Sequence, residues 1–80
     1  MFLREEPKFK IGEEVFVTVE NKIPYGSDTI VVGPGKGIIT DIQEYNDMYI
    51  YTIQRDHYMI PDLKITEPEH CLTKMEIDND

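Results

Sequence analysis

The 80 residues include no alanine and no tryptophan, and there is one cysteine, Cys71. Alanine is the strongest helix former, whereas 22 residues are the β-branched isoleucine, valine and threonine, which favour strands. An all-helical bundle is therefore excluded. A single cysteine cannot form an internal disulfide, and no Cys/His array with zinc-ligand spacing is present. We expect neither a metal nor a cofactor.

Basic residues are also scarce. The chain has 8 Lys and Arg against 16 Asp and Glu, for a formal net charge of -8. The imbalance lies mainly in residues 41–80, which have three basic and ten acidic side chains. Because lysine and arginine supply most of the affinity for a phosphate backbone, this composition argues against nucleic acid as a partner. The acidic second half suits a protein partner with a basic surface, or it serves only to keep the protein soluble, which is the favoured interpretation.

No apolar run approaches the roughly 18 residues that a membrane-spanning helix needs. The first six residues lack the basic region and the apolar run of a secretory signal. We therefore expect a cytoplasmic protein with no membrane partner.

Short strands separated by turn residues are expected along most of the chain. Valines alternate with other residues after Val15, which is typical of a half-buried strand. The step from Ile39 to Ile42 breaks strict alternation and predicts a bulge, and residues 44–47 form a turn. The strands are expected at residues 15–20, 38–43, 48–55 and 58–60, followed over residues 62–66 by a single 3₁₀ turn and a last short strand. A small strand is possible at 29–32, inside a long connection over 21–37.

The end of the chain has a helical signal. Thr66 and Glu69 have the spacing of a capping box, which predicts a short helix over residues 67–75. The remaining residues are expected to form an acidic tail.

Three segments resemble small β-barrels of the Tudor-like and KOW-like kind. The opening is Phe9-Lys10-Ile11-Gly12-Glu13-Glu14-Val15, the second strand is Gly37-Ile38-Ile39-Thr40-Asp41-Ile42, and the ending is Tyr51-Thr52-Ile53 with Ile60-Pro61-Asp62-Leu63. The resemblance covers about residues 9–66. It implies a mainly β, SH3-like five-stranded barrel with a long first loop, preceded by an arm at 1–8 and followed by the short helix and tail at 67–80. Residues 31–37 also faintly resemble a loop of CarD-type modules, which bind RNA polymerase.

No catalytic constellation is evident. The loop Gly33-Pro34-Gly35-Lys36-Gly37 lacks the Ser or Thr and the following helix of a phosphate-binding P-loop. His57, His70 and Cys71 are the candidate bases and nucleophiles at neutral pH, but their spacing supplies no third group to orient them. We do not expect an enzyme.

Tyrosines are clustered in the second half of the chain. The favoured interpretation is that their rings fill a small core that has no tryptophan. The alternative is a shallow aromatic groove beside aspartates, suited to an Arg- or Lys-bearing peptide through cation–π and ion-pair contacts. Phe16, out of phase with the valines around it, either packs against a terminal segment or belongs to a binding patch. The candidate partner-binding residues are Tyr45, Asp47, Tyr49, Tyr51, Asp56, Tyr58 and Asp62.

The leading hypothesis is a non-enzymatic interaction module, a monomer or weak homodimer, whose acidic surface binds a basic protein. The composition would suit a small phage or bacterial accessory protein that inhibits or redirects a nucleic-acid-binding partner by imitating DNA. One alternative is a nucleic-acid-binding or transcription-associated barrel that uses Lys8, Lys10, Lys22 and Lys36. Another is a structural subunit that oligomerises through Phe16 or an open strand.

Overall fold

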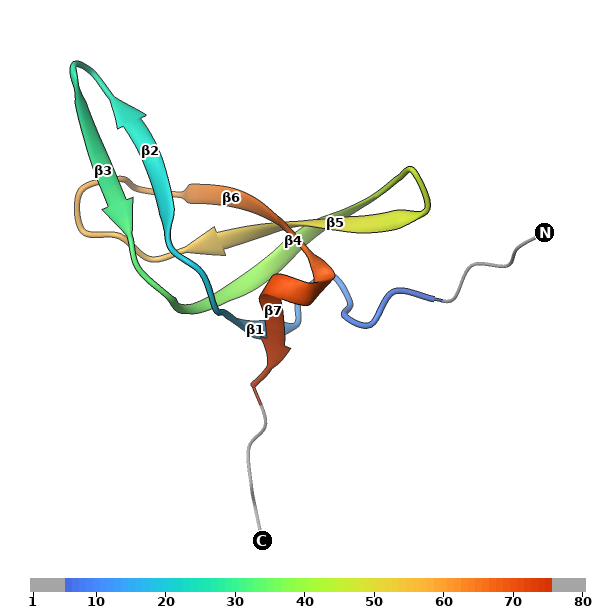
Figure 1. Ribbon diagram of the computed structural model, residues 1–80. Coiled ribbons are helices and arrows are strands. Elements are labelled where there is room, and N and C mark those ends of the chain that lie inside the picture. Colours follow the sequence, from blue (N-terminus) through green and yellow to red (C-terminus); the bar gives the residue numbers. More distant parts are fainter. Residues whose placement is uncertain (1–5, 76–80) are drawn as a thin grey trace, which may run out of the picture.

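The computed structural model describes residues 6–75, which are mainly β-strand (Figure 1). The only helical element in this range is a 3₁₀ turn, and no helix there is long and apolar enough to cross a membrane. The elements are β1 (Glu14–Val17), β2 (Asn21–Tyr25), β3 (Asp28–Val32), β4 (Gly35–Tyr45), β5 (Met48–Arg55), β6 (Leu63–Pro68), η1 (Glu69–Cys71) and β7 (Leu72–Lys74).

Five of the strands form one antiparallel sheet in the order β6-β5-β4-β1-β7. β2 and β3 form a separate hairpin, which packs against the core through Val32, Ile23 and Ile30 and whose turn projects beyond the sheet (Figure 1). The mainly β expectation is confirmed. Within the described residues the sheet is open, because its edge strands β6 and β7 do not pair with each other.

β4 is the longest strand and bends at the predicted bulge. Its register with β5 shifts between Ile39 and Asp41, so one extra residue, Thr40, stands on β4. The shift reverses which residues face inward. Ile39 is fully buried before the bulge, and Ile42 packs against the core after it. The three-residue step in the sequence is thus explained.

The core lies on one face of the sheet, and the period-two pattern places its residues there. Alternate residues point to the same face of a strand, which buries Val15 and Val17 of β1 while Phe16 between them is 37% exposed. Phe9 reaches the core from the segment before β1, and Tyr51 meets it edge-on at a ring distance of 5.4 Å. The buried apolar residues are Phe9, Val15, Val17, Val32, Ile39, Tyr51, Ile53, Leu63, Ile65 and Leu72.

The predicted helix over 67–75 is wrong. Thr66 stays in β6, η1 is a single turn preceded by Pro68 with no side-chain cap, and residues 72–74 form β7. β7 pairs with β1, so tertiary hydrogen bonds outweigh the local helical signal. Residues 76–80 lie outside the described range.

Two other expectations need correction. The predicted strand at 58–60 is a bend in the loop between β5 and β6. The connection over 21–37 is more regular than expected, because β2 and β3 pair across Gly26 and Ser27. Gly26 has a φ of 64°, which suits the first position of a two-residue hairpin turn.

Candidate protein-binding surface

The β4–β5 hairpin extends beyond its neighbours in the sheet (Figure 1). β1 pairs with β4 only as far as Ile38, and β6 pairs with β5 only from Ile50 onward. We call residues 41–49 the hairpin tip. Its turn residues Asn46 and Asp47 have φ values of 52° and 66°, which fit a two-residue turn of type I′. Asparagine and aspartate tolerate this conformation well, which is why the chain reverses here.

The hairpin tip is acidic and bears exposed apolar groups. No lysine or arginine occurs between Lys36 and Arg55, whereas Asp41, Glu44 and Asp47 all fall in the tip. These three acidic residues are exposed. Tyr45 and Met48 face each other across the turn, with 66% and 41% of their surface exposed. The tip therefore combines negative charge with an accessible aromatic ring.

The structure separates the seven candidate binding residues into two groups and a core residue. Tyr45, Asp47 and Tyr49 lie at the hairpin tip, where Tyr49 is half-buried against the core. The second group lies in the loop after β5. From Tyr49 to Asp56 the chain advances seven residues along β5 and just past its end, which separates the groups by roughly 23 Å at the usual rise per residue. Asp56, Tyr58 and Asp62 form this second group.

Tyr51 is the core residue. Its side chain is fully buried, and its hydroxyl donates a hydrogen bond to Oε2 of Glu69 at 2.6 Å. The same carboxylate oxygen accepts a hydrogen bond from the backbone N–H of Lys8 at 3.0 Å. Burial, and then the bond to Glu69, raise the pKa of the Tyr51 phenol. Its ring fills the interior, as the favoured interpretation of the tyrosines expects, and does not line a groove.

The loop between β5 and β6 is organised by local contacts. Tyr58 is 93% exposed and stacks on His57 with 5.0 Å between the ring centroids. Nδ1 of His57 accepts a hydrogen bond from the backbone N–H of Met59 at 3.1 Å. His57 therefore stabilises a turn, and its Nδ1 is already engaged.

Cys71 lies beside a buried acid. Burial first, and then the neighbouring Glu67 carboxylate, raise the pKa of the Cys71 thiol. Glu67 is itself buried and accepts a hydrogen bond from Nδ2 of Asn21. A thiol with a raised pKa is a poor nucleophile at neutral pH. Within residues 6–75, no group of His, Cys, Asp or Glu side chains has the arrangement of a metal site.

Sequence reasoning does not identify two buried polar residues, Arg55 and Glu67, although the strand pattern contains a signal for both. In β5, the residues that point inward alternate from Tyr51 through Ile53 to Arg55. In β6, the same alternation runs from Leu63 through Ile65 to Glu67. The period-two rule therefore points both charged side chains inward. Their charge alone would have suggested exposure.

No protein-family model, curated protein or solved structure matches this chain. The resemblance to small barrels thus depends on the short motifs around Gly12 and Gly37 and on the order of the strands. Because small β folds serve many unrelated functions, the function has to be inferred from the chemistry of the surface.

Proposed function

We propose that this protein is a non-enzymatic interaction module whose hairpin tip binds a protein partner with a basic surface. The observation that carries the proposal is the uniform charge of the tip. Three exposed acidic residues and no basic ones occupy the part of the β4–β5 hairpin that extends past the rest of the sheet.

The exposed aromatic ring supports the same partner class. A guanidinium or ammonium group gains energy from the face of a tyrosine ring as well as from nearby carboxylates. Tyr45 offers such a face at 66% exposure, within the same turn as Asp47. Negative charge at a projecting end also accelerates encounter with a basic surface. Such a surface would compete with nucleic acid for the partner.

We further propose that the fold is an SH3-like small barrel. The strand order places β1 between β4 and β7, so the first and last strands of the main sheet are neighbours. A long first connection, here the β2–β3 hairpin, precedes three consecutive strands in a meander, β4 to β6. This arrangement of strands supports the proposal.

An arginine–glycine peptide, titrated into the isotope-labelled protein at low salt, tests the binding proposal. Amide signals of residues 41–49 should shift, and the affinity should fall as salt screens the exposed charges. In a variant with Asp41→Asn, Glu44→Gln and Asp47→Asn, the affinity should fall by about tenfold. These changes remove charge while keeping the shape and the turn preference of each residue.

The chain offers a matched control with the same change in net charge. Glu6→Gln, Glu20→Gln and Asp28→Asn alter three exposed acids that are not candidate binding residues. If the control variant loses affinity as much as the tip variant, overall charge rather than the tip is responsible and the proposal is wrong. Binding of a DNA or RNA oligonucleotide at low salt, with a steep salt dependence, would instead favour the lysine-based alternative.

A further inference from the structure

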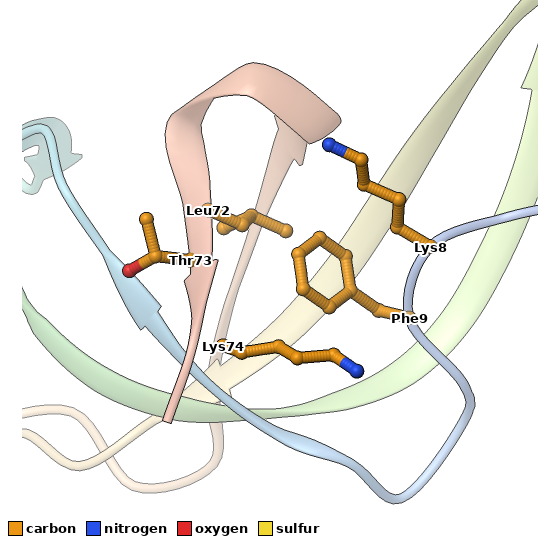
Figure 2. A pocket seen from close by; sticks show the side chains of 5 residues that line it. All are labelled: Lys8, Phe9, Leu72, Thr73 and Lys74. Atoms are coloured by element: carbon orange, nitrogen blue, oxygen red, sulfur yellow. The ribbon is translucent and has the colours of Figure 1, made fainter. Parts of the chain in front are cut away.

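A second surface has the opposite chemistry to the hairpin tip. An open cavity of about 450 Å³ lies between β7 and the segment that precedes β1. Its volume falls within the range of roughly 300–1,000 Å³ that is usual for ligand sites. The lining residues are Lys8, Phe9, Leu72, Thr73 and Lys74 (Figure 2).

The floor of this cavity is apolar. Phe9 and Leu72 belong to the core, and Figure 2 shows the Leu72 side chain pointing toward the Phe9 ring. Thr73 points to the other side of β7 (Figure 2). An apolar group that entered the cavity would therefore extend the core and would itself be removed from water.

The rim of the cavity is basic. Figure 2 shows the side chains of Lys8 and Lys74 on either side of the Phe9 ring. Both lysines are exposed, and neither ammonium forms an ion pair with another residue in the range 6–75. Among residues 6–75, no acidic residue lines the cavity, although acids outnumber bases two to one in the whole chain. The cavity is thus a local basic site on an acidic protein.

We propose that this cavity binds a peptide segment of a partner protein in which an apolar side chain is flanked by carboxylates. The apolar side chain lies over Phe9 and Leu72, and the carboxylates meet Lys8 and Lys74. A ligand with a single carboxylate would engage only one of the two ammonium groups. In an extended peptide, acids placed two residues before and after the apolar residue point to the same side as it does. The inference is independent of the proposed function, which concerns another surface and the opposite charge.

The test is a titration of the isotope-labelled full chain with the capped peptide Glu-Ser-Leu-Ser-Glu. Amide signals of Lys8, Phe9 and residues 72–74 should shift in a saturable manner. The Lys8→Glu/Lys74→Glu variant should bind at least about tenfold more weakly, because both favourable pairs become repulsive. Core residues are left unchanged, so the variant should fold. The neutralised hairpin-tip variant should bind the peptide as the wild type does.

Matched controls separate the two parts of the proposal. Lys22→Glu/Lys64→Glu makes the same change in net charge at exposed lysines outside the cavity and should leave binding unchanged. Gln-Ser-Leu-Ser-Gln tests the carboxylates and Glu-Ser-Ser-Ser-Glu tests the apolar group; both should bind more weakly.

Three outcomes would overturn the proposal. The first is the absence of saturable shifts at these residues, and the second is equal binding of the wild type and the Lys8/Lys74 variant. The third is a concentration-dependent dimer that this variant abolishes, because the cavity would then receive a second copy of the chain.

Discussion

The guanidinium of Arg55 lies buried beneath the start of β4, where its Nη2 donates a hydrogen bond to the carbonyl oxygen of Gly33 at 2.8 Å. Nε and Nη1 are also buried, and neither has a partner among the described protein atoms. Burial lowers the pKa of this guanidinium. A buried arginine with one hydrogen bond and no acidic partner among residues 6–75 is costly.

Replacing Arg55 by methionine should therefore leave stability unchanged or raise it by about 1 kcal/mol. Methionine keeps an unbranched chain in the same space and removes the unpaired nitrogens. Gly33 is an exposed residue, so its carbonyl can bond to water instead. Urea denaturation of the two proteins measures the difference. A loss of more than about 2 kcal/mol would show that Arg55 has partners that compensate its burial.

The glycines that lie close to Arg55 should differ in how much stability they lose on substitution by alanine. A Cβ added at Gly37 would overlap Cγ2 of Ile53 and would lie 2.8 Å from the backbone oxygen of Gln54, so Gly37→Ala should destabilise by about 1–3 kcal/mol. Nothing lies within 4 Å of a Cβ added at Gly33, so Gly33→Ala is the matched control and should change stability by less than about 0.5 kcal/mol. Thermal or urea unfolding decides, and equal effects at the two positions would contradict this packing.

Local patterns predicted those parts of the fold that local chemistry determines. β5 has the expected bounds, and the bulge in β4 lies between Ile39 and Ile42 as expected. β7 was missed because its three residues become a strand only through β1, which lies far away in the sequence. In the same way, the capping-box pattern at Thr66 could not show that the following residues would find a strand with which to pair. These local patterns carry no information about which distant segments of the chain will pair as strands.

The candidate site was predicted in part, for the same reason. Tyr45, Asp47 and Tyr49 are neighbours because a tight hairpin joins them, which the sequence indicates. Their proposed association with Asp56 and Asp62 required β5 to bend back, but β5 is a continuous strand that holds the two groups apart. The cavity beside β7 depends on the β1–β7 pairing and so could not be anticipated.

Tyr51 should make the stability of the protein fall at high pH. Its folded-state pKa is raised above the usual value near 10. At pH values between the pKa of Tyr51 in the unfolded chain and its raised pKa in the native state, the unfolded chain loses the phenol proton that the native state retains. The contribution of Tyr51 to the free energy of unfolding should therefore be fully present below about pH 10. Above this pH, the free energy of unfolding should fall by up to about 1.4 kcal/mol per pH unit.

Tyr51→Phe should remove this contribution to the slope and also cost about 1–2 kcal/mol at pH 7, because Glu69 loses a hydrogen bond. Tyr45→Phe, on an exposed ring, is the control and should keep the slope. Urea denaturation at several pH values from 8 to 11 provides the measurement. An unchanged slope in Tyr51→Phe would show that other groups cause the loss of stability.

Glu67 should suppress the reactivity of Cys71. Burial and the adjacent carboxylate both raise the pKa of the thiol, and only the thiolate attacks disulfide reagents. In the native protein, Cys71 should thus react with a disulfide reagent at neutral pH at least about tenfold more slowly than in the urea-unfolded chain. Glu67→Gln keeps the shape of the side chain and removes its charge, so the native reaction should become faster.

Cys71 is only partly buried, so the reagent can reach it without unfolding. If Glu67→Gln leaves the native rate unchanged, burial alone sets the reactivity. If both proteins react at the unfolded rate, the thiol is not protected by the fold at all.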